Sequence, residues 1–410
     1  MNINESTRQY IAAHATDDAA HLALHPSKDP QVDMAVALQQ IAGRQKAKEK
    51  LPKWYATEGV LYPKKVSMEQ CSSSQTAEYK ASLVEGDSFA DFSGGFGVDT
   101  VSLARKFDTG WYVEPQQELC ELFQHNCKVL DINNVNIING TMEDHIADIG
   151  PVDTIYLDPS RRDVHGRKVV ALEDCVPNLL EWKERLLAKC NTLMVKLSPM
   201  IDIFQTLRDM PETYAVHVIA VEGECKEVVF LLKRDENLVN GTCRDAARRV
   251  STTDPTIMAV DINKTTTSHV ETTLETERTT PPRIATELGA YLYEPNAAVM
   301  KAGIFNALSQ QFQIAKLAKN TNLFTADELC EDFPGRVFRI EAVHEFHPRK
   351  TGKELSHLAN ASIAVRNFPM TAEELRKALK IKDGNACYLF GCTLLNGRKI
   401  ILKVQKIEGE

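Results

Sequence analysis

The middle of the chain alternates short apolar runs with longer segments that have helical periodicity. Between residues 81 and 234, five such runs predict strands, and the connections between them are long enough for crossover helices. Two later runs, Ala215–Val221 and Glu227–Leu232, are joined by a turn-length segment, which predicts an antiparallel hairpin. The pattern therefore predicts an α/β fold in which a parallel sheet, covered by helices, is closed by an antiparallel hairpin. The five parallel strands are predicted at Ser88–Phe92, Gly110–Val113, Val135–Ile138, Asp153–Leu157 and Thr192–Val195.

The segments outside this sheet have weaker patterns. Apolar residues at helical spacing between Val32 and Ile41 predict that the N-terminal segment is helical. Residues 251–281 are rich in Thr and run into a Pro-Pro pair, which is typical of edge strands, a loop or a linker. Ala297–Lys319 predicts one helix or a pair of helices. We therefore expect an N-terminal helical segment, the sheet domain, a small α+β or linker region and a small C-terminal domain, at residues 1–80, 81–234, 235–334 and 335–410.

Charge is distributed unevenly along the 410 residues. The whole chain has 48 Lys and Arg against 56 Asp and Glu, a net charge of −8, which excludes a uniformly basic nucleic-acid-binding protein. Residues 335–410 carry 14 basic and 8 acidic side chains, so this segment is +6 and the first 334 residues are −14. Such asymmetry is typical of a catalytic body joined to a module that meets an anionic partner, although +6 alone is common. A basic run from Arg44 to Lys53 either extends this surface or is a solvated helix face.

Composition also limits the class and the compartment. The chain is 43% hydrophobic and 25% charged, as in ordinary globular proteins, and no apolar run is long enough to span a membrane. The N-terminal residues are polar and acidic and have no signal-peptide pattern, so we expect a cytoplasmic protein that does not contact membranes. Ten cysteines are scattered without a C-x-x-C pair, which favours reduced thiols and no metal site.

The strongest local motif is a glycine-rich turn, Asp91-Phe92-Ser93-Gly94-Gly95-Phe96-Gly97-Val98-Asp99, between a predicted strand and a predicted helix. Glycines in this position let the backbone turn sharply and approach a ligand. Glu114 ends the next predicted strand, where an acid accepts hydrogen bonds from ribose hydroxyls. Thr100 replaces the third glycine of a dinucleotide loop, which disfavours a nicotinamide dehydrogenase. The leading Asp91 favours a cationic ligand such as S-adenosylmethionine.

The D-x-x-x-G-x-G turn, Glu114 and the hairpin resemble those of class I S-adenosylmethionine-dependent methyltransferases, which have a Rossmann-like sheet, over about residues 70–234. Asp158-Pro159-Ser160-Arg161-Arg162 resembles the (D/N/S)-P-P-x motif of enzymes that methylate amino nitrogens of nucleic-acid bases. Glu69–Ala77 resembles the segment that such enzymes place over the methionine end of the cofactor. Arg366-Asn367-Phe368-Pro369 and the basic helix Ala372–Lys380 resemble the THUMP-like domain of a bacterial methyltransferase group.

This resemblance implies roles for individual residues. Asp158 and the carbonyl group of Pro159 would accept the two N–H bonds of the target amine, with Ser160 completing the catalytic turn. Arg161 and Arg162 would bind the substrate, or they form only surface ion pairs. The implied cofactor contacts come from Asp91, Ser93, Gly94, Gly95, Phe96, Gly97, Glu114, Met142, Gln75 and Thr76.

The sequence departs from the family pattern at two positions. Ser160 stands where the family usually has a second proline, and Thr141 stands where an acid commonly contacts adenine. Glu143 or Asp144 could take that contact, or Met142 could pack on the ring.

Three functions remain to be compared with one another, beside the nicotinamide dehydrogenase that Thr100 disfavours. The resemblance implies a methyltransferase acting on an exocyclic amino nitrogen of tRNA or rRNA, at guanine N2 or adenine N6. The two departures motivate an alternative, an RNA-binding protein that kept the fold and lost turnover. A small-molecule methyltransferase would not need the basic C-terminal segment. Methylation of pyrimidine carbon 5 would need a cysteine nucleophile, which is absent from Asp158–Arg162 and from Lys196–Met200.

Overall fold

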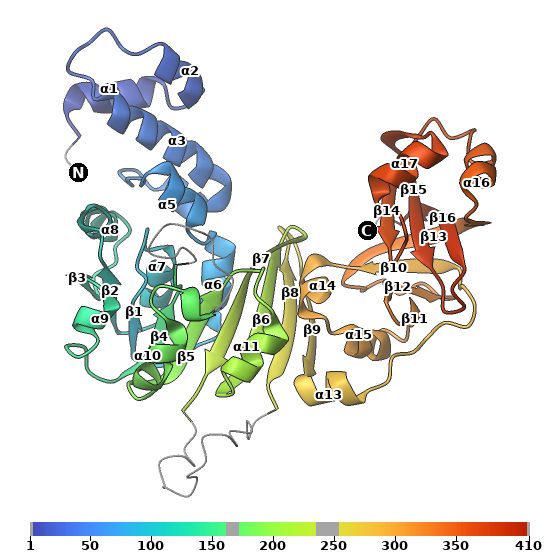
Figure 1. Cartoon of the computed structure of the whole chain (residues 1–410). Coiled ribbons are helices and arrows are strands. Elements are labelled where there is room, and N and C mark those ends of the chain that lie inside the picture. Colours follow the sequence, from blue (N-terminus) through green and yellow to red (C-terminus); the bar gives the residue numbers. More distant parts are fainter. Residues whose placement is uncertain (1–2, 161–171, 235–253, 408–410) are drawn as a thin grey trace, which may run out of the picture. The chain divides into compact units, whose positions relative to one another are not determined.

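The computed structural model describes residues 3–160, 172–234 and 254–407, and its larger sheet has nine strands (Figure 1). Its strand order is β3-β2-β1-β4-β5-β7-β6-β8-β9. Strands β1 to β5 pair in parallel, and β7 is antiparallel to β5. The predicted fold class is therefore confirmed. The strands are β1 (Ser88–Asp91), β2 (Thr109–Glu114), β3 (Val135–Asn139), β4 (Val152–Leu157), β5 (Cys190–Leu197), β6 (Thr213–Val221), β7 (Glu224–Leu232), β8 (Thr256–Ile262) and β9 (Thr267–Thr273).

The hairpin between β6 and β7 follows from two residues. Glu222 and Gly223 both have left-handed backbone conformations, with φ of 52° and 75°. A two-residue turn with positive φ at both positions matches the right-handed twist of its strands. The predicted antiparallel closure of the sheet is thus made by the tightest connection available.

Helices precede and connect these strands. The predicted N-terminal helical segment consists of α1 to α6, and the predicted crossover helices include α7, α8 and α10, which contact β2, β3 and β5 respectively. The helices of this part are α1 (Glu5–Ala13), α2 (Ala19–Leu24), α3 (Met34–Lys50), α4 (Pro52–Ala56), α5 (Lys65–Gln70), α6 (Ser74–Ser82), α7 (Val98–Ala104), α8 (Gln117–Val129), α9 (Met142–His145), α10 (Leu179–Leu187) and α11 (Ile203–Asp209), with a 3₁₀ turn, η1, at Leu172–Asp174. Among the described residues, no helix is both long enough and apolar enough to cross a membrane.

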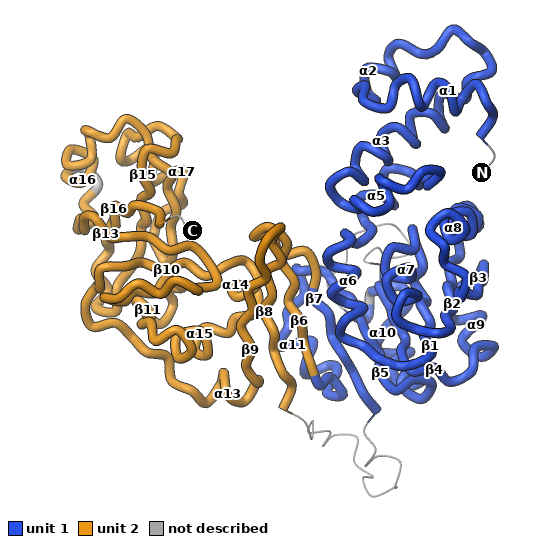
Figure 2. Tube along the Cα trace, turned by 180° about the vertical axis from the view of Figure 1, so that it is seen from behind, with its two compact units in different colours: residues 1–214, 228–253 blue, residues 215–227, 254–410 orange. Residues whose placement is uncertain are grey.

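The chain divides into two compact units, residues 1–214 with 228–253, and residues 215–227 with 254–410 (Figure 2). The second unit contains a seven-stranded sheet in the order β11-β12-β10-β13-β16-β15-β14. Its strands are β10 (Tyr291–Pro295), β11 (Ala315–Ala318), β12 (Thr321–Ala326), β13 (Gly335–Glu345), β14 (Asn360–Arg366), β15 (Lys382–Thr393) and β16 (Lys399–Lys406). Its helices are α13 (Leu274–Thr279), α14 (Ala297–Ala302), α15 (Phe305–Gln311), α16 (Pro348–Glu354) and α17 (Ala372–Leu379).

The helical pattern predicted for Ala297–Lys319 is only partly correct. Gly303 ends α14 and Gln313 follows α15, and both residues have positive φ, so the chain cannot continue as a helix through them. The last part of the predicted segment is strand β11, which pairs with β12.

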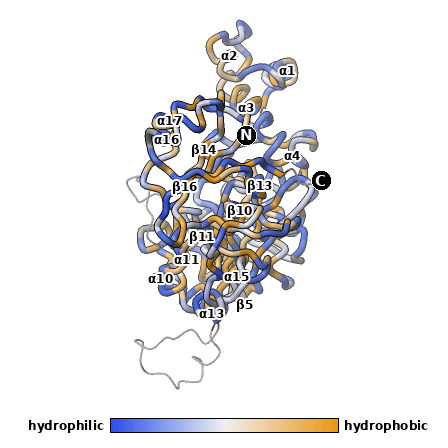
Figure 3. The backbone as a smooth tube through the Cα atoms, turned by 90° about the vertical axis from the view of Figure 1, so that its right-hand side faces the viewer, coloured by the Kyte–Doolittle hydropathy of each residue, from blue (hydrophilic) through white to orange (hydrophobic). Residues whose placement is uncertain are grey.

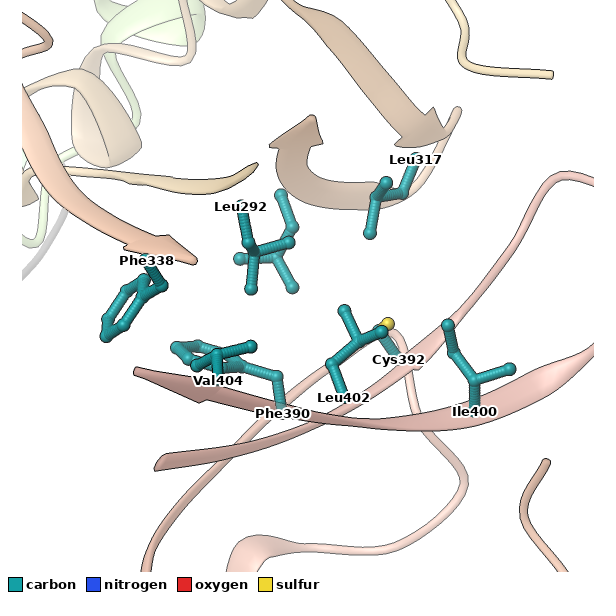
Figure 4. Packing of buried hydrophobic residues seen from close by; sticks show 9 residues of the cluster. Leu292, Leu317, Phe338, Phe390, Cys392, Ile400, Leu402 and Val404 are labelled. Carbon is teal, nitrogen blue, oxygen red and sulfur yellow. The ribbon is translucent and has the colours of Figure 1, made fainter. Parts of the chain in front are cut away.

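Two apolar clusters hold the seven-stranded sheet together. Leu292 and Phe338 belong to one cluster, which Figure 4 shows together with Phe390, Leu402 and Val404. Leu389 belongs to the second cluster, with Leu355, which follows α16, and residues of α17. Successive strand residues point to opposite faces, so adjacent Leu389 and Phe390 serve different clusters. The hydropathy colouring of Figure 3 shows how apolar and polar stretches alternate along the chain.

Candidate active site

Charged residues gather where β1, β2, β4 and β5 end. Asp91 and Glu114 are the last residues of β1 and β2, Asp158 follows β4, and Lys196 lies one residue before the end of β5. Strand β1 lies between β2 and β4, so the strand order reverses direction here. Open α/β sheets bind ligands outside the carboxyl ends of their strands at such a reversal.

The carboxyl group of Asp91 holds the glycine-rich turn in place through hydrogen bonds. Asp91 is 1% exposed, and its Oδ1 accepts hydrogen bonds from the backbone N and the Oγ of Ser93, at 2.9 and 3.1 Å. The Thr100 hydroxyl donates to Oδ2 at 2.6 Å. Burial raises the pKa of Asp91 to about 7. Asp91 thus joins the end of β1, the turn and the first residues of α7.

The glycines of this turn meet different constraints. Gly97 has a φ of 84°, and a Cβ there would lie 2.2 Å from the Phe123 ring. A Cβ on Gly94 would collide with the Tyr112 ring at 2.3 Å. Gly95 has a φ of 53°, but a Cβ there would meet no atom closer than the Ser93 carbonyl oxygen, at 3.6 Å. Gly94 and Gly97 are therefore required by packing, whereas the half-buried Gly95 has no side chain of another residue pressed against it.

Glu114 is bonded to the same turn. It is 6% exposed, and its two carboxylate oxygens accept hydrogen bonds from the backbone N–H groups of Gly95 and Gln116, at 3.0 and 2.9 Å. The Tyr112 hydroxyl donates to the Gly95 carbonyl at 2.7 Å, and burial raises the pKa of Tyr112. A carboxylate has about four acceptor positions, so Glu114 retains capacity for ligand hydroxyls.

Asp158 is connected to the turn through Ser93. The backbone N–H of Asp158 donates to Ser93 Oγ at 2.7 Å, while Ser93 itself is held by Asp91. The Asp158 side chain is 37% exposed and forms an ion pair with Lys196, whose side chain is 12% exposed. Sequence reasoning missed Lys196. The available signal was a lysine that interrupts an apolar run near the carboxyl end of a strand.

The backbone after Asp158 explains the serine at position 160. Ser160 N–H donates to the Val176 carbonyl at 2.8 Å, and Val176 N–H donates back to the Ser160 carbonyl at 3.1 Å. A proline has no N–H and could not make the first of these bonds. Hydrogen bonds replace a second proline here, and the intervening Pro159 is buried. Arg161 and Arg162 lie outside the described residues.

The segment before the sheet is tied to the first turn of α7. Ser72 Oγ donates to Asp99 Oδ2 at 2.7 Å, and Lys80 Nζ lies 2.9 Å from Asp99 Oδ1. Burial by itself would raise the pKa of Asp99, but the ammonium groups of Lys80 and Lys196 hold it below its usual range. Tyr156 of β4 also donates to Asp99, at 3.0 Å. The segment is thereby held beside the glycine-rich turn.

The remaining residues with implied cofactor roles lie in different surroundings. Thr76 is 2% exposed and its hydroxyl donates to the Ser73 carbonyl within the first turn of α6, where Gln75 is half-buried. Phe96 is buried, and its ring centroid lies 4.8 Å from that of Trp54 in α4. The structure joins Asp91, Ser93 and Asp158 in one hydrogen-bonded group and Gly95 with Glu114 in a second, whereas Phe96 packs against an N-terminal helix.

Thr141 has a local structural role. It is the N-cap of α9, its Oγ1 accepts a hydrogen bond from Asp144 N–H at 3.3 Å, and the same hydroxyl donates to the Asp144 carboxylate at 2.8 Å. Met142 is 2% exposed, while Glu143 is exposed. Thr141 therefore has a structural role as a helix cap, which an aspartate would also fill, so capping does not account for the missing acid.

The described part of the chain contains no cluster of side chains that could bind a metal ion. Within residues 3–160, 172–234 and 254–407, no group of three or more His, Cys, Asp or Glu side chains is placed to hold a metal ion.

Comparison with known proteins identifies the fold and the C-terminal domains. A family model described as a ferredoxin-like domain matches residues 291–334, and a model described as THUMP domain-like matches residues 335–406. The crystal structure of a proposed methyltransferase from Porphyromonas gingivalis W83 aligns over 100% of both chains, at 30% identity and a TM-score of 0.85. The fold is that of class I methyltransferases. The chain belongs to the family of these enzymes that carries a C-terminal THUMP-like domain.

Other solved structures align over a smaller part of the chain. An rRNA methylase from Streptococcus thermophilus is 14% identical over 39% of this chain and 95% of its own, with a TM-score of 0.30. A tRNA (uracil-54, C5)-methyltransferase from Pyrococcus abyssi is 16% identical over 38% of this chain and 37% of its own, also with a TM-score of 0.30. No curated protein matches the chain.

Proposed function

We propose that this protein uses S-adenosylmethionine to methylate an exocyclic amino nitrogen of a base in RNA, at guanine N2 or adenine N6. One observation carries the proposal. Ser93 bonds both to Asp91 beneath the glycine-rich turn and to the backbone of Asp158, so the turn and the Asp158 loop form one hydrogen-bonded unit.

The donor set of the turn fits this cofactor. Gly95 is half-buried with no close side-chain neighbour, and the buried Glu114 carboxylate beside it has acceptor capacity for the two ribose hydroxyls. Ser93, Gly94, Gly97 and Met142 would line the same site, with Gln75 and Thr76 at its methionine end. Asp91 would act indirectly, because its carboxyl oxygens bond to Ser93 and Thr100. S-adenosylmethionine would supply an electrophilic methyl group.

Asp158 and Pro159 account for the choice of an amino nitrogen. An exocyclic amine conjugated to a base is a weak nucleophile and presents two N–H donors. A carboxylate and a backbone carbonyl that accept these donors direct the nitrogen lone pair and stabilise the positive charge that develops during transfer. Alignment supplies most of the catalysis in such a displacement, so no strong base is required beforehand.

RNA is the proposed partner because of the C-terminal domain. Gly352 of α16 packs against Ala378 and Leu379 of α17, so these two helices form one layer. Exposed ammonium groups lie on this layer and at the start of β15, namely Lys350, Lys353, Lys377, Lys380 and Lys382. The first 334 residues carry −14 and would repel a polyanion, so attraction must come from a local surface such as this one.

The direct test is methyl transfer to separate nucleic-acid pools. The protein is incubated with radiolabelled methyl donor and with tRNA, rRNA or DNA from cells that lack it, and the labelled nucleoside is identified by chromatography. We expect N2-methylguanosine or N6-methyladenosine from one RNA pool, and at least a 100-fold loss with Asp158→Asn, which keeps the side-chain shape. Label on a carbon atom, in DNA alone or in a small molecule would contradict the proposal. Tight cofactor binding without transfer to any pool would favour a binding protein that has lost turnover.

A further inference from the structure

Lys196 occupies an unusual place for a lysine. It lies in β5 between Val195 and Leu197, which are 0% and 5% exposed, and its own side chain is 12% exposed. Removing an ammonium group from water costs several kcal/mol unless an opposite charge compensates for it. An exposed pair such as Lys226–Glu224, whose side chains are 41% and 75% exposed, has no such requirement.

The charges around Lys196 come from several elements. The carboxylate of Asp158, after β4, contacts its ammonium group directly, and Asp99 of α7 interacts with it electrostatically. Lys50 of α3 is a repulsive neighbour. Burial lowers the pKa of Lys50, and the charge of Lys196 lowers it further. Asp158 and Asp99 both carry a charge opposite to that of Lys196, and Asp158 contacts its ammonium group.

Asp158 is held at two points by groups from two other strands. Ser93, after β1, accepts its backbone N–H at 2.7 Å, and Lys196 of β5 donates to its Oδ2. Fixing the backbone and one carboxylate oxygen sets the direction of the other oxygen, Oδ1. The Asp158 side chain remains 37% exposed, so Oδ1 can meet a substrate.

We propose that Lys196 is a positioning residue for methyl transfer, which holds the Asp158 carboxylate through Oδ2 so that Oδ1 accepts an N–H of the target amine. This inference rests on the proposed function, because it assigns Asp158 to the amine. The chemical step itself needs nothing further. The nitrogen–methyl bond forms as the sulfur–methyl bond breaks, the electron pair of the broken bond stays on sulfur, and the nitrogen then releases one proton to solvent.

The test compares Lys196→Met, which removes the charge, with Lys196→Arg, which keeps it. Lys226→Met is the matched control, since it breaks an exposed lysine–carboxylate pair. We expect Lys196→Met to lower kcat for RNA methylation about 10–100-fold, because a small misplacement of a group at the reacting centre has an effect of this size. KM for RNA and calorimetric affinity for the cofactor should stay within about twofold, and Lys196→Arg should recover most of the rate.

A double-mutant cycle separates positioning from a general structural role. In an Asp158→Asn background, Lys196→Met should cost less than about twofold in kcat, because Lys196 acts through Asp158. Full additivity of the two substitutions would overturn the proposal, as would a wild-type rate for Lys196→Met. A raised KM with a changed salt dependence would assign Lys196 to RNA phosphate, and a lost cofactor affinity would assign it to the cofactor pocket. Either result would also overturn the inference.

Failure of the proposed function would be visible separately. If the wild-type protein transfers no methyl group to RNA, the proposed function fails, and the catalytic role of Lys196 fails with it. The wild type, Lys196→Met, Asp158→Asn and the double variant are also unfolded thermally, without cofactor or RNA. Non-additive changes in Tm would show that the pair forms, and additive changes would overturn the geometry on which the inference rests.

Discussion

The glycine-rich turn of the first unit buries its acids, whereas the ferredoxin-like and THUMP-like domains of the second unit combine a buried acid with exposed lysines. Around the turn, the acids Asp91 and Glu114 are buried and accept hydrogen bonds from nearby backbone N–H groups. In the C-terminal part, buried Glu294 of β10 pairs with Arg336 and Arg366 from β13 and β14, while lysines of α16 and α17 remain exposed. Burial, rather than charge alone, separates side chains that build a region from side chains available to a partner.

The largest expected effect tests the packing of the turn. Gly97→Ala places a Cβ 2.2 Å from the Phe123 ring, in addition to the strain of a φ of 84°. The matched control, Gly397→Ala, has a φ of 79° and no atom within 4 Å of the new Cβ. We expect about 3–5 kcal/mol of destabilisation for Gly97→Ala and about 1–2 kcal/mol for Gly397→Ala, measured by urea unfolding. Equal losses of unfolding free energy would mean that the collision with Phe123 adds nothing to the backbone strain.

The next effect tests the ion pairs that Glu294 forms with Arg336 and Arg366. Glu294→Gln removes the charge that faces both Arg336 and Arg366, and we expect it to cost about 2–4 kcal/mol of stability. Asp383→Asn is the control, since Asp383 is 78% exposed where it pairs with Arg376, and it should cost less than about 0.5 kcal/mol. A loss for Glu294→Gln as small as that of the control would show that Glu294 is dispensable.

The buried acid of the turn predicts a pH dependence. Because the folded pKa of Asp91 is raised to about 7, its contribution to stability is fully present below its unfolded pKa, near 4, and is lost as pH rises to 7. We expect a loss of about 1 kcal/mol per pH unit between pH 5 and 7. Urea unfolding from pH 5 to 8 should show a flatter profile for Asp91→Asn than for the wild type. Parallel profiles would exclude Asp91 as the group responsible.

The acid at the end of β2 tests the cofactor site. Glu114→Ala removes the acceptor for two backbone N–H groups and for the ribose hydroxyls, and we expect calorimetric affinity for S-adenosylmethionine to fall by about 1–3 kcal/mol. Glu118→Ala in the first turn of α8 is the control and should bind normally. Unchanged affinity in Glu114→Ala would remove Glu114 from the proposed site.

The smallest effect concerns the exposed lysines. Substituting Lys377, Lys380 and Lys382 together with Ala should weaken RNA binding, and the slope of log affinity against log salt should flatten by about 0.7–0.9 for each RNA phosphate that the protein no longer neutralises. Point substitutions are preferable to deletion of 335–410, because β13 to β16 share an apolar cluster with β10 to β12. Cofactor affinity should not change. An unaltered salt slope in filter-binding assays would place the RNA surface elsewhere.

Much of the fold could be predicted from local patterns. Runs such as Thr192–Val195 predicted their strands because burial on both faces demands continuous apolar residues. Glu114 could be placed at a strand end because its distance from the glycine-rich turn corresponds to one helix and one strand. The expectation for Ala297–Lys319 was wrong near its end, because positive φ at Gln313 stops the helix and β11 finds a partner in β12.

The sequence by itself therefore determined strands β1 to β7 of the nine-stranded sheet, the turn and the charge asymmetry of this protein, since each follows from residues that are neighbours along the chain. It did not determine that β8 and β9 extend the same sheet. Only the tertiary structure decided three contacts: the ion pair of Asp158 with Lys196, the hydrogen bond from Asp158 N–H to Ser93, and the ion pair of Arg366 with Glu294. These contacts join residues 38, 65 and 72 positions apart. Their existence depends on which strands become neighbours and on how completely water is removed there, and no local periodicity carries that information.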